Sequence, residues 1–199
     1  MIRILLIRHG STDLLGRVLY GRMPGVHLNG EGRKQAEVLG QALSERYVID
    51  AIQSSPLERA LETAQFIAAH RGTPIAIDER LNEIDVGSWL GKSFSELAGM
   101  DDWKRYNRIR SMSTPPGGES MMQVQLRAWA ALQDMEVRQA GNGGTVAAVT
   151  HGDVIRGLLI LMLGMSLDHI HRLEVGPASV SEAVLEDGQA RVLRINQIF

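Results

Sequence analysis

Two runs of consecutive apolar residues mark the chain. The first extends from Ile2 to Ile7 and is interrupted only by Arg3, and the second extends from Thr145 to Val149. Runs this short and this uniformly apolar are typical of strands buried on both faces, as in a parallel sheet. We therefore predict that both segments are central strands.

Shorter apolar segments predict the remaining strands. Residues 51–53 and 75–77 are expected to form brief strands. Residues 180–185 and 190–195 are separated by the turn sequence at 186–188, and they predict a closing antiparallel hairpin.

Between these strands, apolar residues recur at the spacing of amphipathic helices. Asn29 can cap a helix that ends near Tyr47, and Ser55 is expected to cap a second helix with Pro56 at its first position. Three further helices are expected after the capping-box sequence at 93–96, from about 117 to 139, and from 154 to 163.

The alternation of strands and helices predicts an α/β fold. We expect a single three-layer domain over residues 1–199, with a mostly parallel central sheet, an antiparallel edge strand and helices on both faces. Two long loops, 13–27 and 79–91, interrupt this pattern, and loops of that length are often functional. Residues 101–116 are charged and weakly periodic and are expected to form a mobile surface insert, and residues 141–144 are expected to form a turn.

Composition narrows the functional classes. The chain has 199 residues, of which 44% are hydrophobic, and its net charge of −2 gives no general attraction to nucleic acid or to an anionic membrane. It has no cysteine, which excludes disulfides and thiolate metal sites. The first apolar run is too short for a signal peptide, and no segment approaches the roughly 18 apolar residues of a membrane helix. We expect a cytoplasmic protein that is a monomer or a homodimer.

Both predicted central strands end in a histidine followed by a glycine. His9 and Gly10 follow the first strand, and His151 and Gly152 follow the other. Neighbouring parallel strands would place both imidazoles at one edge of the sheet, where ligands of α/β proteins bind. We expect the glycines to let the backbone approach a ligand closely.

Two arginines are expected at the same edge. Arg8 precedes His9, and Arg59 lies on the first turn of a helix that follows a strand. The amide groups and dipole of a helix N-terminus favour an anion. Two guanidinium groups and two imidazoles therefore predict a compact cationic pocket that suits a phosphoryl group.

Five motifs occur in order over nearly the whole chain. They are RHG at residues 8–10, SSPLERA at 54–60, Leu81-Asn82-Glu83 followed by Gly87 and Trp89, PPGGES at 115–120, and THGDVIR at 150–156. Because it has these five motifs in this order, the chain resembles the histidine phosphatase superfamily, the phosphoglycerate-mutase-like proteins. The span of about 25 residues between Trp89 and Pro115 is closer to its phosphatase branch, which includes enzymes resembling α-ribazole phosphatase and broad-specificity phosphatases, than to its mutases.

The resemblance implies specific roles. His9 would be the nucleophile that becomes phosphohistidine, and Glu83 would protonate the leaving oxygen and later activate water. Arg8, Arg59 and His151 would hold the phosphoryl oxygens. These five are the expected catalytic residues, and no cofactor or metal is implied.

Further contacts to a small phosphorylated substrate are expected from the flanking positions. Gly21 matches a backbone phosphate contact of the family, and Arg22 could reach an anionic substrate. Thr12 and Gly152 complete the expected substrate contacts. The 101–116 insert overlies the active site in the family resembled, so its cations, Lys104, Arg105, Arg108 and Arg110, could also grip an anionic substrate.

The chain departs from the family pattern at three positions. Ser11 stands where glutamate is frequent, Leu15 where asparagine is frequent, and Leu90 where glutamate is usual. One hydrogen bond on the phosphate side is therefore expected to be missing or to come from another residue.

Alternative interpretations follow from other residues. A cofactor-dependent phosphoglycerate mutase, or a catalytically weak regulator that binds a phosphorylated ligand, would use the same pocket. His169 and His171 would lie on one strand face as metal ligands, but no third ligand is spaced to match. Asp85 near Glu83 suggests a glycosidase pair, which would leave the histidines and arginines without a role.

Overall fold

The computed structural model describes residues 1–139 and 143–199, and its centre is one six-stranded sheet. The strand order is β3-β2-β4-β1-β5-β6. The pairs formed among β1, β2, β3 and β4 are parallel, whereas β5 is antiparallel to both β1 and β6. The strands are β1 (Ile2–Arg8), β2 (Ala51–Ser54), β3 (Ile75–Ile77), β4 (Thr145–Thr150), β5 (Val180–Glu186) and β6 (Gln189–Gln197).

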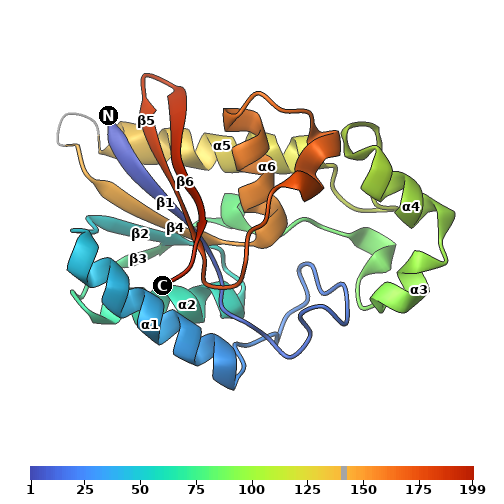
Figure 1. The fold of residues 1–199 in the computed structure, drawn as a ribbon, viewed down its shortest axis with the longest axis horizontal. Helices are drawn as coiled ribbons and strands as arrows, with labels where there is room; N and C mark the ends of the chain where they lie inside the picture. The colour runs from blue at the N-terminus through green and yellow to red at the C-terminus, as the bar shows by residue number, and fades with distance from the viewer. Residues whose placement is uncertain (140–142) are drawn as a thin grey trace.

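Helices cover both faces of the sheet, with α1 and α2 on one side and α5 and α6 on the other (Figure 1). The α-helices are α1 (Gly30–Arg46), α2 (Glu58–Ala69), α3 (Phe94–Ala98), α4 (Asp101–Arg108), α5 (Met121–Arg138) and α6 (Gly152–Met162). The 3₁₀ helices are η1 (Glu79–Leu81), η2 (Gly87–Trp89), η3 (Arg110–Met112) and η4 (Leu167–Arg172). The predicted α/β class, the mostly parallel sheet and the antiparallel edge are confirmed.

Alternation along β1 explains how one apolar run serves two faces. Side chains of a strand point alternately to opposite sides. Leu5 and Ile7 contact the core beneath α1 and α2, whereas Ile4 and Leu6 contact the core beneath α5 and α6. All four are fully buried, which is why the segment shows no polar alternation.

The start of α2 differs from the prediction. The helix begins at Glu58, and its N-cap is Leu57, which has extended backbone angles and no capping side chain. The hydroxyl of Ser55 accepts the N–H of Leu57 at 3.3 Å but also contacts His151, so it serves the histidine rather than a helix end. By contrast, Asn29 caps α1 as predicted, because its Oδ1 accepts the N–H of Gly32 at 2.8 Å.

The segment expected to be a mobile surface insert is helical and partly buried. It forms α4 and η3, and Tyr106 and Arg110 are only 2% and 4% exposed. Trp103 and Tyr106 lie edge-to-face against Trp89, with ring centroids 5.4 and 5.3 Å apart. One pair of aromatic residues anchors this helix, and its exposed positions are nearly all charged or polar, so the segment is more ordered in secondary structure than its weak periodicity suggests; its mobility stays a prediction.

The turn expected at 141–144 lies partly outside the described residues, since residues 140–142 are not among them. Gly143 and Gly144, which precede β4, both have positive φ angles, of 64° and 134°. In the described ranges, none of the helices is both long and apolar enough to cross a membrane.

Candidate active site

Strand pairing places the two histidines side by side, as the sequence predicts. Arg8 of β1 is paired with Thr150 of β4, so His9 and His151 follow at the same edge of the sheet. The backbone N–H of His9 donates to the carbonyl of Thr150 at 3.1 Å. The imidazole centroids are 5.2 Å apart, and both rings are buried.

The hydrogen bonds of His9 fix its tautomer. Nδ1 lies 2.7 Å from the carbonyl oxygen of Gly10, which can only accept, so the ring proton is on Nδ1 and Nε2 carries the lone pair. Arg59 donates its Nε–H to Nε2 at 3.3 Å. Burial, followed by the charges of Arg59 and Arg8, holds the pKa of His9 well below its usual value. His9 is therefore a neutral imidazole at pH 7.

Two guanidinium groups, the buried Arg59 and the half-buried Arg8, place positive charge near this ring. Arg59 donates to the carbonyl of Gly21 at 2.6 Å, and Arg8 donates to the carbonyl of Val175 at 2.6 Å. In the described part of the chain, Nη1 of Arg59 and Nε of Arg8 are buried without a partner. A buried cationic donor without a partner is costly, so these groups favour an anionic ligand.

His151 is oriented by Ser55. Nε2 of the imidazole lies 2.7 Å from the Ser55 hydroxyl, which already accepts the N–H of Leu57. The hydroxyl proton is then free to point to Nε2, an arrangement that puts the ring proton of His151 on Nδ1. This Nδ1 is buried, with no hydrogen-bond partner among residues 1–139 and 143–199. Burial, then the charges of Arg59 and His9, lowers the pKa of His151 well below its usual value.

Glu83 lies in the loop after η1 and lines a cavity that Arg8 and His9 also line, whereas Arg59 and His151 lie outside its lining. Burial, together with the charge of Asp153, raises the pKa of Glu83 to about 7 against the opposing effects of the Ile84 N–H and the charges of Arg59 and Arg8. Its Oε1 accepts the N–H of Ile84 at 2.9 Å. A carboxyl group with this pKa can both donate and accept a proton near neutral pH.

The cavity has a volume of about 240 Å³, and its lining has an apolar part and a polar part. Part of its lining is apolar and comes mainly from loop 13–27, α3 and α4, with Leu15, Val18, Leu19, Phe94 and Trp103. The other part is polar and comes from α4, η3, α6 and η4, with Asn107, Arg110, Asp153, Arg156 and His171. The 101–116 segment therefore does border the site.

The polar part of the lining is organised around Asp153. Arg110 and Arg156 donate to its two carboxylate oxygens at 3.2 and 3.1 Å. Burial acts to raise the pKa of Asp153, but these two charges outweigh it and hold that pKa below its usual value. Of the four cations of the insert, Arg110 alone lines the cavity, and Lys104, Arg105 and Arg108 are exposed.

The expected substrate contacts divide into two groups. Gly21 and Gly152 line the cavity, the latter as the first residue of α6. Thr12 is buried but does not line the cavity. Arg22 does not line it either, and its guanidinium is paired with Glu119. Gly10 serves packing rather than a ligand, because a Cβ there would lie 2.5 Å from the carbonyl oxygen of Gly32.

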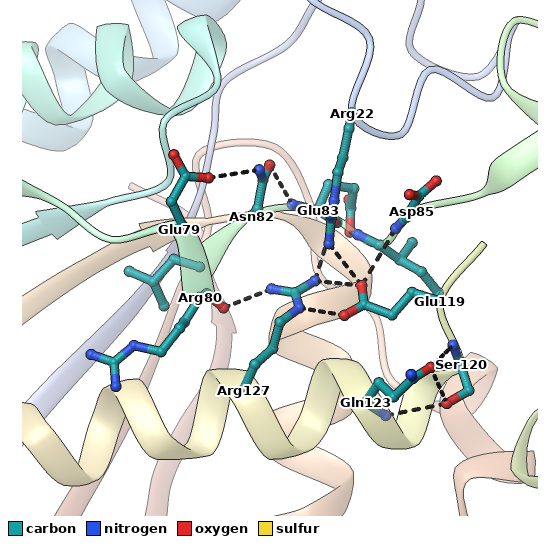
Figure 2. Close-up of polar contacts among 12 residues, drawn as sticks. Arg22, Glu79, Arg80, Asn82, Glu83, Asp85, Glu119, Ser120, Gln123 and Arg127 are labelled. Atoms are coloured by element: carbon teal, nitrogen blue, oxygen red, sulfur yellow. Dashed lines mark hydrogen bonds and ion pairs between the residues drawn. The ribbon is translucent and has the colours of Figure 1, made fainter. Parts of the chain in front are cut away.

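The most extensive feature that the sequence analysis missed is an ion-pair network behind Glu83 (Figure 2). The carboxylate of Glu119 lies between Arg22 and Arg127, and both arginines also donate to the backbone carbonyl of Glu83. The PPGGES motif includes Glu119, and that was the available signal. Thr63 was also missed; its hydroxyl accepts the N–H of Gly10 at 3.1 Å.

The two histidines considered as metal ligands are not on a strand. His169 and His171 belong to η4, and Nε2 of His171 lies 3.2 Å from Oδ1 of Asn107. Within the described ranges, no group of three His, Cys, Asp or Glu side chains is placed to hold a metal ion.

Comparison with known proteins identifies the family. The profile of the histidine phosphatase superfamily (branch 1) matches residues 4–198. The chain is 35% identical over 197 residues to the bifunctional protein Rv2228c of Mycobacterium tuberculosis; the match covers 98% of this chain and 54% of that protein, so the chain spans about half the length of this relative. It is 30% identical over 198 residues to phosphoserine phosphatase 1 of Hydrogenobacter thermophilus, with 98% of this chain and 92% of that protein covered.

A solved structure of a similar protein has the same fold. The mycobacterial glucosyl-3-phosphoglycerate phosphatase Rv2419c in complex with VO3 superimposes with a TM-score of 0.88 at 26% identity, over 98% of this chain and 99% of that one. The profile match, the relatives and the site geometry agree, and the chain belongs to the histidine phosphatase superfamily.

Proposed function

We propose that this protein hydrolyses phosphomonoesters of small metabolites, without a metal ion, through a phosphohistidine intermediate on His9. The observation that carries the proposal is a set of three buried N–H groups beside His9. These are Nε of Arg8, Nη1 of Arg59 and Nδ1 of His151, and each lacks a partner in the described residues. Three donors match the three equatorial oxygens of a transferring phosphoryl group.

The state of His9 supports its role as nucleophile. Its Nε2 has a lone pair and its pKa is low, so no proton has to leave before attack. In the first step Nε2 forms a bond to phosphorus while the bond from phosphorus to the ester oxygen breaks. The Gly10 carbonyl accepts the Nδ1–H, which stabilises the positive charge that the ring then carries.

Glu83 supplies and then removes the proton that the two steps require. With a pKa of about 7, its carboxylic acid is present at neutral pH and protonates the departing alkoxide, giving a free alcohol. The resulting carboxylate takes a proton from water, whose oxygen attacks phosphorus as the bond to Nε2 breaks. Inorganic phosphate leaves, and His9 and Glu83 return to their starting states.

The cavity indicates a small leaving group. A volume of about 240 Å³ is below that of most drug-sized pockets, and the two parts of the lining suit a group with an apolar and a polar side. The backbones of Gly21 and Gly152 remain proposed substrate contacts, because both line the cavity. The relatives named for phosphoserine and glucosyl-3-phosphoglycerate provide the first compounds to test.

The deciding experiment measures phosphate release in EDTA by the wild type, His9→Ala and the control His70→Ala, which removes an exposed histidine. The substrates are phosphorylated metabolites and p-nitrophenyl phosphate, each with and without 2,3-bisphosphoglycerate. We expect EDTA-resistant hydrolysis that His9→Ala abolishes and His70→Ala leaves intact. An acid-labile, base-stable phosphoprotein should accumulate in quenched wild-type reactions, because a phosphorus–nitrogen bond has those properties.

The alternatives give different results in the same assay. Conversion of 3-phosphoglycerate into its 2-isomer without hydrolysis would identify a mutase. No turnover combined with tight phosphate binding would identify a regulator. Hydrolysis that EDTA abolishes would contradict the proposed mechanism.

A further inference from the structure

The carboxylate of Glu119 connects two arginines from distant segments. Its Oε1 accepts Nε of Arg127 at 2.7 Å, and its Oε2 accepts Nη2 of Arg127 at 3.0 Å and Nη2 of Arg22 at 2.9 Å. Arg127 lies on α5, whereas Arg22 lies in loop 13–27. The pairing with Arg127 is bidentate, the geometry in which an arginine is most strongly oriented by a carboxylate.

Both arginines converge on one backbone oxygen (Figure 2). The carbonyl of Glu83 accepts Nε of Arg22 at 2.7 Å and Nη2 of Arg127 at 3.2 Å. Arg127 also donates to the carbonyl of Arg80 at 2.6 Å, so it holds both ends of the segment 80–83. The N–H of Glu119 donates to the carbonyl of Asp85 at 2.8 Å, which fixes the chain just after Glu83.

Two guanidinium groups at one carbonyl repel each other unless an anion lies between them. Glu119 is mostly buried, with a side chain 15% exposed, so its charge is weakly screened. If this charge were removed, Arg22, whose side chain is 35% exposed, would be free to turn toward solvent. The carbonyl of Glu83 would then lose its shorter hydrogen bond.

The carboxyl group of Glu83 has few side-chain contacts of its own. Among the described residues, its one hydrogen bond is to the N–H of Ile84, the next residue in the chain. The position of the carboxyl therefore depends on the position of the main chain at 83–84. A displacement of that main chain moves the carboxyl relative to His9 and the ester oxygen.

We propose that Glu119 is a positioning residue that acts through Arg22 and Arg127 to hold the carboxyl of Glu83 at the leaving oxygen. The proposal rests on the proposed function, in which Glu83 protonates that oxygen. It predicts a chemical signature that a purely structural role lacks. Loss of Glu119 should slow substrates that need protonation of the leaving group more than substrates that do not.

The test compares Glu119→Ala, Glu119→Gln and Glu83→Gln with the wild type on an alkyl phosphate and on p-nitrophenyl phosphate, whose leaving group needs little protonation. We expect Glu119→Ala to lower kcat for the alkyl phosphate by about tenfold to a hundredfold, the scale of a misplacement near 1 Å. The loss with p-nitrophenyl phosphate should be several-fold smaller. Glu119→Gln keeps the shape and one acceptor and should give an intermediate loss of the same kind.

Asp134→Asn is the matched control. Asp134 lies on the same helix as Arg127 and forms an ion pair with Arg80 at 2.7 Å, but it makes no contact with Glu83. We expect this variant to keep wild-type rates with both substrates. Thermal unfolding of every variant shows whether a lost rate follows a lost fold.

A double variant tests whether Glu119 acts through Glu83. If it does, Glu119→Ala should cost little additional activity in the Glu83→Gln background, because the group it positions no longer donates a proton. Two results would overturn the positioning role of Glu119 and leave the role of Glu83 in place. One is a full additional loss of activity when Glu119→Ala is added to Glu83→Gln. The other is an equal loss with both substrates in Glu119→Ala while Glu83→Gln still slows the alkyl phosphate more. A Glu83→Gln variant without leaving-group selectivity would overturn the proposed role of Glu83 and this proposal with it.

Discussion

Nε of Arg59 lies 3.3 Å from Nε2 of His9, so the nitrogen expected to attack phosphorus faces a fixed cation before any ligand arrives. The same guanidinium donates to Gly21 and leaves Nη1 without a partner in the described residues. Together with burial, Arg59 keeps Nε2 unprotonated, and in the proposed function it also offers charge to a phosphoryl oxygen. This contact underlies the first prediction.

We expect Arg59→Ala to lower kcat/KM by about 10²–10³, the usual loss when one preorganised donor is removed from a transition state. Thermal unfolding should change much less, because the variant also removes a buried charge whose desolvation opposes folding. Steady-state kinetics and calorimetry provide the two measurements. A melting temperature that collapses with the activity would show that Arg59 mainly supports the fold.

The pH dependence should follow Glu83. Its pKa of about 7 predicts that alkyl phosphate hydrolysis declines as pH rises through 7, since the protonated acid is then lost. Asp153→Asn removes a negative charge that raises this pKa, so the alkaline limb should move to lower pH. Asp101→Asn, which changes an exposed carboxylate of α4, should leave the profile unchanged.

The comparison uses one substrate for all variants, so the ionisation of the substrate itself cancels. The two arginines that Asp153→Asn leaves unpaired act in the same direction, because nearby positive charge also lowers a carboxyl pKa. An alkaline limb that stays in place, or moves to higher pH, would contradict the assignment to Glu83.

Ser55→Ala tests how His151 is oriented. The hydroxyl of Ser55 lies 2.7 Å from Nε2 of His151, and its loss should release the ring from a single tautomer. We expect kcat to fall roughly five- to tenfold, the equivalent of about one neutral hydrogen bond. Nitrogen NMR of the imidazole should show the ring proton on Nδ1 in the wild type and a mixture in the variant. Unchanged nitrogen shifts would refute this role.

Trp103→Ala tests the anchoring of α4. The indole contacts Trp89 edge-to-face at 5.4 Å and borders the cavity. Because Trp103 is only partly buried, we expect a loss of about 2–3 kcal/mol in the free energy of unfolding, below the range for fully buried aromatics. KM should also rise as the cavity wall loosens. Urea denaturation measures the change in the free energy of unfolding. The control is Met112→Ala, which changes a residue that is 80% exposed in the same segment.

Local pattern and sheet geometry were sufficient to place His9, His151 and Arg59 together. Each of these residues follows a strand, and parallel strands bring their carboxyl ends to one edge. The sequence also predicts the cap formed by Asn29, because its partner Gly32 is only three residues away.

Long-range contacts explain what the sequence did not predict. Arg22 and Glu119 are 97 positions apart, and their pairing depends on how α5 lies against the Glu83 loop. Trp103 is anchored by Trp89, which lies before the preceding helix, so the partner that covers the aromatic face of α4 is not a local one. Ser55 is a residue type that often caps helices, which is why the sequence predicts a cap. Its actual partner, His151, lies 96 positions away in the chain.

The neighbouring residues Gly21 and Arg22 have a consequence for how this enzyme family can diversify. Gly21 is bound to Arg59 beside His9, and Arg22 is bound to Glu83, so one peptide unit connects the two halves of the reaction centre. Leu15 and Leu19, which line the cavity proposed to hold the leaving group, come before that unit in the same loop. We therefore expect changes of length or sequence before Gly21 to alter substrate preference, and an insertion between the two residues to separate the proposed nucleophile from the proposed acid.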